Sequence, residues 1–380
     1  MKSLIISTLI FLLVTAGYSQ STHSHKLSIG LGNEWNAFLS PSRFLEDEEF
    51  LSRNELWDNG TYQAIALNNS FKKEGDKYRI KLKLNGSLGI YQTQQNSNRY
   101  TYRLGASYRL KYASKKYFEL APDFFRKRRE GVNTDNAVLA TPFSYSLLKL
   151  PVGFDFYLGN KTWIKTEVGY LYKNYDKPSG EKLLYHAPFI EGEISKKWES
   201  DSRTTKLSLK SLTQTRKYET RSSRIDEDDE DEVTFLDGSR DWTYQFTELT
   251  LDSSKDDDSR AFGIGLYQMS RIDSDGSSTF HEVGPGIQYE GNNSKFGYKT
   301  LVKYTFRNYT RLSPGSENET PLRYQYLRAN FELDFAISEY GKVYGSANLV
   351  NRTSNNPNLE ALSFREYFNG FVEMGIRWAW

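Results

Sequence analysis

The chain has 380 residues, of which 38% are hydrophobic and 15% aromatic, and its formal net charge is +2. This near-neutral charge excludes nucleic-acid binding through a strongly basic surface. The mean hydropathy is negative and no apolar run after the first residues is long enough for a helical span, which excludes a helical membrane protein.

The N-terminus has the pattern of a secretory signal. A single Lys precedes an apolar stretch over residues 4–14, which is too short to span a bilayer as a helix and has the length of a signal-peptide core. Small residues occupy the −3 and −1 positions of a cleavage site before Gln20. We therefore predict that residues 1–19 are a signal peptide and that residues 20–380 form one exported domain. No Cys is present to carry a lipid anchor.

The remaining sequence alternates apolar and polar residues with the period of two that a β-strand requires. Over 100–112 the even positions hold Tyr, Leu or Ala, and most odd positions hold Arg, Lys, Gly or Ser. Similar alternation recurs over 80–90, 296–307 and 327–337. A soluble sandwich would need a second sheet over each apolar face, whereas a membrane barrel covers that face with lipid. The 27 Tyr and 23 Phe favour strands and suit the aromatic girdles of such a barrel.

The whole pattern predicts an all-β protein, a closed antiparallel transmembrane β-barrel of about sixteen strands, with fourteen to eighteen possible. The expected strands are 27–36, 60–71, 78–91, 99–112, 117–126, 143–157, 162–175, 185–198, 204–215, 241–251, 260–270, 279–289, 296–309, 322–337, 342–350 and 364–380. The alternation is weakest over 117–126.

The lengths of the connections follow a parity rule. Connections after even-numbered strands are short, as at 74–77 and 159–161, and most of those after odd-numbered strands are long, as at 37–59 and 216–240. Barrels of this class alternate short periplasmic turns with long outer loops, so the parity predicts that both termini are periplasmic. The connection at 252–259 is longer than this rule expects.

Many charged residues fall on the strand face that would line the lumen. The candidates are Lys81, Lys83, Arg103, Arg109, Lys111, Lys299, Lys303, Arg307, Glu332, Asp334, Glu373 and Arg377. Rings of Lys and Arg favour anions in a pore, while the acids indicate a lumen polarised across its width. The alternative is that these charged side chains pair with one another across neighbouring strands, fill the interior of the barrel and have no role in permeation.

Two charged runs are predicted at the outer face. The acidic run in the loop 216–240 consists of Asp226, Glu227, Asp228, Asp229, Glu230, Asp231 and Glu232. It could bind divalent cations or bridge through them to lipopolysaccharide phosphates, but a solvated, self-repelling loop is the simpler interpretation. The basic run 126–129 opens another predicted loop and could hold the same phosphates.

No motif for catalysis, a metal or a cofactor is present. A barrel esterase needs Ser, His and an orienting Asn or Asp on neighbouring strands, and nothing in the sequence singles out such partners for His186 or His281. The spacing of a zinc site and the Gly-rich loop of a phosphate site are both missing. We therefore expect neither an enzyme nor a bound metal or cofactor.

The last nine residues complete the pattern. Their apolar face consists of Val372, Met374, Ile376, Trp378 and Trp380, and the chain stops on an aromatic residue. With the signal and the strands, this ending resembles Gram-negative outer-membrane β-barrel proteins of porin-like size, over essentially the whole mature chain. The resemblance implies a position in the outer membrane, contact with its lipid and lipopolysaccharide, and recognition of the last strand by the barrel-assembly machinery. The last strand should pair with residues 27–35, its apolar face toward lipid and Glu373 and Arg377 toward the lumen.

No motif assigns a transport family. The leading prediction is an outer-membrane channel or porin that passes small hydrophilic or anionic solutes through its charged lumen. One alternative is the barrel component of a secretion, surface-assembly or polysaccharide-export system, which would need a periplasmic partner chain. An outer-membrane hydrolase is the third, and no nucleic-acid partner is expected.

Overall fold

The structure is a computed structural model that describes residues 21–46, 49–57, 59–92, 98–129, 132–133, 141–142, 144–176, 183–200, 203–218, 222–225, 233–236, 240–255, 260–274, 278–293, 295–311, 320–359 and 366–380. The predicted signal peptide and the acidic run lie outside the described residues. Within them, no helix is long and apolar enough to cross a membrane. The helix α2 (Arg53–Leu56) has only four residues.

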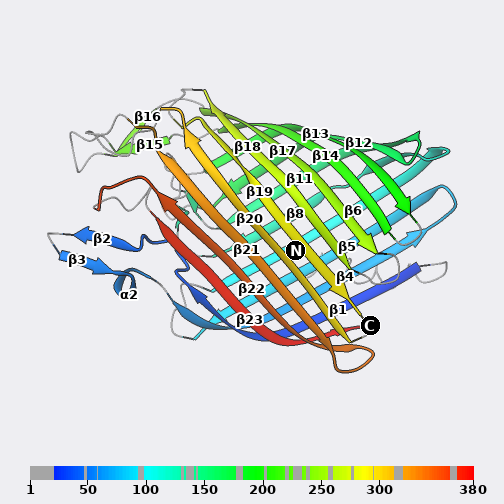
Figure 1. The fold of residues 1–380 in the computed structure, drawn as a ribbon, viewed down its shortest axis with the longest axis horizontal. Helices are drawn as coiled ribbons and strands as arrows, with labels where there is room; N and C mark the ends of the chain where they lie inside the picture. The colour runs from blue at the N-terminus through cyan, green and yellow to red at the C-terminus, as the bar shows by residue number, and fades with distance from the viewer. Residues whose placement is uncertain are drawn as a thin grey trace, which may run out of the picture.

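Antiparallel strands close into a ring of 16 positions (Figure 1). In ring order they are β1 (Ser21–Trp35), β4 (Gly60–Glu74), β5 (Tyr78–Tyr91), β6 (Arg99–Ala113), β7 (Lys116–Leu120) with β8 (Asp123–Arg128), β11 (Tyr145–Gly159), β12 (Thr162–Tyr175), β13 (Leu183–Ser200), β14 (Arg203–Tyr218), β17 (Arg240–Lys255), β18 (Ala261–Asp273), β19 (Phe280–Asn292), β20 (Phe296–Tyr309), β21 (Arg323–Ala336), β22 (Gly341–Ser354) and β23 (Tyr367–Ala379). The predicted fold class is confirmed, and each expected strand overlaps one ring position.

One ring position is interrupted. Both β7 and β8 pair with β6 on one side and with β11 on the other, so together they occupy the place of the strand predicted at 117–126. The break falls at Ala121 and Pro122, because proline has no N–H to donate to a ladder. The carbonyl of Pro122 still accepts from the N–H of Ala106 at 3.0 Å, which keeps the wall closed.

Short hairpins occur within three of the long connections. They are β2 (Arg43–Glu46) with β3 (Glu49–Ser52), β9 (Val132–Asn133) with β10 (Thr141–Pro142), and β15 (Ser222–Ile225) with β16 (Val233–Leu236). The hairpins β2–β3 and β15–β16 stand beyond the same end of the barrel in Figure 1. We call this the long-loop end and the opposite end the short-turn end.

The one connection that departed from the parity rule is shorter than predicted. Strand β17 continues to Lys255 and β18 begins at Ala261, and the N–H of Lys255 donates to the carbonyl of Arg260 at 3.1 Å. The prediction of a long connection at 252–259 was wrong because the polar residues 252–255 extend the strand. This connection therefore also belongs with the short turns.

The final strand closes the ring against the first. The antiparallel register runs from Leu27 opposite Trp378 to Trp35 opposite Gly370. At the chain end, the N–H of Trp380 donates to the carbonyl of His25 at 3.0 Å. The predicted pairing of the two terminal strands is confirmed, and the last residue lies at the short-turn end.

The outer surface of the ring is apolar. Large hydrophobic side chains are exposed on strands all around it, including Leu31 at 56%, Leu266 at 50%, Leu333 at 50% and Met374 at 65%. A water-soluble protein does not leave such a continuous apolar surface in contact with water, whereas a bilayer covers it. The alternation of apolar and polar side chains along each strand therefore gives a transmembrane barrel with an apolar exterior and a polar interior.

Candidate functional site: the barrel lumen

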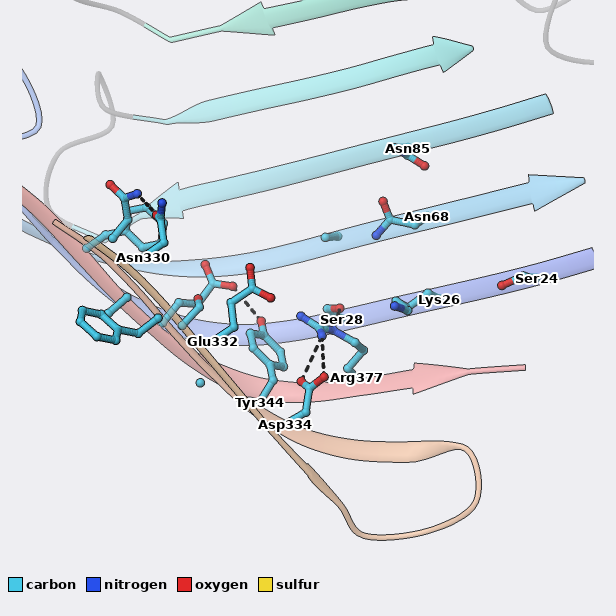
Figure 2. A pocket seen from close by; sticks show the side chains of 18 of the residues that line it. Ser24, Lys26, Ser28, Asn68, Asn85, Asn330, Glu332, Asp334, Tyr344 and Arg377 are labelled. Atoms are coloured by element: carbon cyan, nitrogen blue, oxygen red, sulfur yellow. Dashed lines mark hydrogen bonds and ion pairs between the residues drawn. The ribbon is translucent and has the colours of Figure 1, made fainter. Parts of the chain in front are cut away.

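The inside of the barrel holds a polar cavity of about 600 Å³ in its short-turn half. Side chains from β1, β4, β5, β21, β22 and β23 line it. Figure 2 shows Lys26 and Ser28 on β1, Arg377 on the adjacent strand β23, and Glu332 and Asp334 further along the same wall on β21. Because this arc of adjacent strands lines the cavity with lysine, arginine, carboxylate and amide groups, it can hold water and hydrated solutes.

The charges of this cavity are partly compensated within the wall. The guanidinium of Arg377 donates to a carboxylate oxygen of Asp334 at 3.1 Å (Figure 2). The carboxylate of Glu373 accepts from the hydroxyls of Tyr62 at 3.0 Å and Tyr344 at 2.8 Å. These contacts fix the acidic side chains, so the cavity has positive and negative groups at defined places and no single ring of one sign.

The predicted lumen residues are distributed around the wall. Those that line the cavity of about 600 Å³ are Lys81, Lys83, Glu332, Asp334, Glu373 and Arg377. A second cavity of about 470 Å³ lies beside it against β6 and also includes Arg103, which donates to Asp123 at 2.6 Å. Lys111 lies further along β6, opposite Tyr117.

The remaining members of the set are already in contact with wall residues. Arg109 donates to Asp155 at 2.5 Å, and Lys299 lies 3.5 Å from Glu290. The ammonium of Lys303 lies 3.4 Å from the ring centroid of Tyr267. Arg307 is almost fully buried and pairs with Glu282 at 2.8 Å. A large part of the predicted charge is therefore not available to a passing ion.

Further cross-strand ion pairs, which the sequence reasoning did not identify, continue this pattern. Their Nζ–Oε1 distances are 2.6 Å for Lys149–Glu167, 3.0 Å for Lys206–Glu193 and 2.8 Å for Lys210–Glu191. Each cation and its acid lie on adjacent strands. The pairing that the sequence left open as an alternative thus occurs at many positions of the wall.

A buried carboxylate lies at the long-loop end, also unpredicted. Glu34, near the end of β1, accepts two hydrogen bonds from the guanidinium of Arg129 at 3.1 Å and 3.0 Å. Its carboxylate also accepts from the hydroxyl of Tyr91, and Arg99 lies 3.9 Å away. Arg129 follows β8, which is separated from β1 by three ring positions, so this network spans a segment of the lumen wall.

The basic run 126–129 is divided by this arrangement. Residues 126–128 belong to β8 and not to a loop, so their side chains alternate between the two faces of the wall. Arg126 pairs with Asp176, whereas Arg129 is buried with Glu34. The described residues therefore do not present these four cations as one basic surface.

Many aromatic side chains lie on the inside of the long-loop half. We call this set the aromatic belt: Tyr145, Tyr175, Tyr185, Tyr218, Trp242, Tyr244, Phe280, Tyr309, Tyr324 and Tyr326. Ring centroids of neighbours lie close together, for example 5.0 Å for Tyr218–Trp242 and 5.4 Å for Phe280–Tyr309. Trp242 is 0% exposed and Tyr324 1% exposed. Part of the aromatic content that suggested membrane girdles thus belongs to the interior.

Cations lie against the rings of the belt. The guanidinium carbon of Arg216 is 4.0 Å from the ring centroid of Tyr244, and that of Arg271 is 4.3 Å from Trp242. These distances suit cation–π attraction. A sequence signal was present, since a cation precedes Tyr by two residues at Lys173, Arg216 and Arg307, each near the end of a strand that runs toward the long-loop end.

The structure places His186 and His281 on separate strands, β13 and β19. His281 lies opposite Ser270 on one neighbouring strand and opposite Asn308 on the other, but no hydrogen bond joins the three side chains in the described structure. His186 stacks on Tyr170 with ring centroids 5.9 Å apart. Among the described residues, no group of three or more His, Asp or Glu is placed to hold a metal ion.

The chain matches no family model and no curated protein. Among solved structures it is similar to outer-membrane expressed OmpT of Vibrio cholerae, with 12% identity, a TM-score of 0.45, and coverage of 95% of this chain and 98% of that one. It is also similar to OccK1 (OpdK) of Pseudomonas aeruginosa, with 9% identity, a TM-score of 0.43, and coverage of 94% and 98%. A third similar structure is an anion-selective porin from Comamonas acidovorans, with 9% identity, a TM-score of 0.44, and coverage of 95% of this chain and 99% of that one.

None of these likenesses transfers a function to this chain. The strand pairing itself establishes the architecture: this protein is a closed, 16-stranded, antiparallel transmembrane β-barrel.

Proposed function

We propose that this protein is an outer-membrane channel that passes small hydrophilic solutes by diffusion. The observation that carries the proposal is the combination of an apolar exterior with a polar, charge-lined cavity of about 600 Å³ inside a closed ring. A closed barrel of this strand number encloses a lumen that side chains alone do not fill. The secretory pattern of residues 1–19 and the apolar outer surface of the barrel favour the outer membrane.

The two halves of the lumen would have different roles. The short-turn half, which we take as the periplasmic side, holds the two cavities lined by the predicted lumen residues, while the long-loop half holds the buried aromatic belt. Because the belt residues Trp242 and Tyr324 are almost completely buried, the lumen is filled against the wall at their level. We expect the permeation path to be narrower there, and the selection of solutes to occur there.

Single-channel recording in planar lipid bilayers tests this function. We expect the purified, refolded barrel to give discrete, ohmic conductance steps, because a water-filled polar lumen conducts ions. Heat-denatured protein is the control for leakage. Folded protein that inserts and gives no steps would contradict the channel, and a barrel component of an export or surface-assembly system would then be the better assignment.

A further inference from the structure

Two cations at the level of the aromatic belt, Lys173 and Arg216, face aromatic rings and lie on the same part of the lumen wall. The ammonium of Lys173 lies 3.8 Å from the ring centroid of Tyr145 and 4.4 Å from that of Tyr175. The guanidinium carbon of Arg216 lies 5.0 Å from the ring of Tyr185. In the part of the chain that the structure describes, neither cation has a carboxylate within ion-pair distance.

The two cations lie on the same part of the wall. Lys173 on β12 is directly opposite Tyr185 on β13, and Tyr185 is opposite Tyr218 on β14, two residues from Arg216. Lys173 is close enough to Arg216 and to Lys127 for their charges to act on it. Like charges gathered in a low-dielectric wall repel one another, and an anion placed between them relieves that repulsion.

Polar atoms of the pair remain available. Both side chains are partly exposed, so a solute in the lumen can reach them. The buried Nε of Arg216 has no hydrogen-bond partner among the described residues. A guanidinium and an ammonium on two strands separated by β13, neither with a carboxylate partner among the described residues, can together donate several hydrogen bonds to one carboxylate.

The surroundings of Lys173 are apolar. Leu147 lies directly opposite it on β11, and the partly exposed rings of Phe125 and Tyr145 have centroids 5.7 Å apart. A fully hydrated inorganic anion gains no binding free energy from contact with such an apolar surface, because it has no apolar area to bury. An organic anion with a hydrophobic part gains both charge pairing and burial of apolar area.

We propose that Lys173 and Arg216 form a binding site for small organic carboxylates that carry an apolar group, and that this site sets the solute preference of the lumen. The proposal rests on the channel function above. The carboxylate would lie between the two cations, and the apolar group would lie against Tyr145, Phe125 and Leu147. The paired cations elsewhere on the wall would contribute less, because their charges are already compensated.

Reversal potentials under a salt gradient test the site in potassium benzoate, potassium acetate and potassium chloride. We expect the wild-type barrel to be more permeable to anions than to cations. We also expect benzoate to inhibit the chloride current more strongly than acetate does. Lys173→Gln and Arg216→Gln should each lower the anion-to-cation permeability ratio about threefold or more, because each removes one lumen charge at the narrow level. Arg216→Lys should retain most of the anion-to-cation permeability ratio, because lysine keeps the positive charge at this position.

A matched control and a second readout keep the test independent of the pore. Lys161→Gln removes the same charge from an exposed pair with Glu199 at a short turn, and should leave the permeability ratio unchanged. Saturation-transfer NMR on folded barrel in detergent should detect benzoate binding that Lys173→Gln abolishes. If the folded protein gives no conductance but benzoate binding is detected by NMR, the proposed channel function is wrong and the proposed carboxylate site is supported. The proposed site is refuted if the barrel conducts without preferring anions. It is also refuted if Lys173→Gln and Arg216→Gln change neither the permeability ratio nor benzoate binding. In both cases the proposed channel function is unaffected.

Discussion

The Gly375→Ala variant is expected to fail to close the barrel, or to close it with greatly reduced stability. A methyl group on Gly375 would lie 2.1 Å from the carbonyl oxygen of Ile29 and 2.6 Å from the Cα of Gly30. Both are backbone atoms of β1, so no side-chain movement can relieve the clash. Gly30 is directly opposite Gly375 in the register of β1 and β23, and two glycines allow these strands to approach closely.

The expected cost is about 3 kcal/mol or more, the upper range for overpacking, because the contact lies on the strand pair that completes the ring. The folded fraction can be measured from the shift in gel mobility between unheated and heated protein, and stability from urea unfolding in lipid vesicles. Gly345→Ala on the neighbouring strand β22 is the control, since its methyl group would meet no atom within 4 Å. If the Gly375 variant folds as well as the Gly345 variant, the close approach is not required.

Neutralising Glu34 should be the second strongly destabilising change. In Glu34→Gln the guanidinium of Arg129, whose side chain is only 8% exposed, would lose the charge of the Glu34 carboxylate while remaining buried. Breaking a buried ion pair from one side costs about 3–5 kcal/mol, since an uncompensated charge is left in a low-dielectric site. The measurement is the urea midpoint of unfolding, followed by tryptophan fluorescence in vesicles.

Two controls separate the buried pair from general charge effects. Glu199→Gln removes a carboxylate from an exposed pair in which Lys161 lies 2.6 Å away, and should leave the midpoint unchanged. The double variant Glu34→Gln, Arg129→Met should recover much of the stability lost by Glu34→Gln, because the buried guanidinium is removed together with the carboxylate that faces it. A double variant no more stable than Glu34→Gln would show that the loss has another cause than the buried charge of Arg129.

The strands and their order could be predicted because their signals are local. The alternation over 100–112 places its apolar residues on the lipid side whatever strand lies beside it, since side chains point to opposite faces in turn. Short connections such as 159–161 identify hairpins for the same reason. The interruption at Pro122 and the extension of β17 to Lys255 were missed because they depend on whether the neighbouring strand can continue its ladder.

The contacts inside the barrel could not be predicted in the same way. Sequence alternation put Arg109 and Arg307 on the inner face, but their acids, Asp155 and Glu282, are 46 and 25 residues away in the chain. The belt was missed because its tyrosines were taken for residues of the membrane girdles, although Tyr175, Tyr218 and Tyr309 share a strand face with the cations two residues before them. Only the register of each strand against its neighbours brings these rings into contact.

The sequence by itself therefore determined the class of fold and predicted about sixteen strands, within a range of fourteen to eighteen, because these rest on period two and on loop length. The pairing of the first strand with the last was predicted because a barrel must close. The tertiary structure alone decided which charges are compensated and which remain. Glu34 and Arg129 are 95 residues apart and meet through the curvature of the wall. Lys173 and Arg216 face aromatic rings because the register of β12, β13 and β14 places Tyr185 between them.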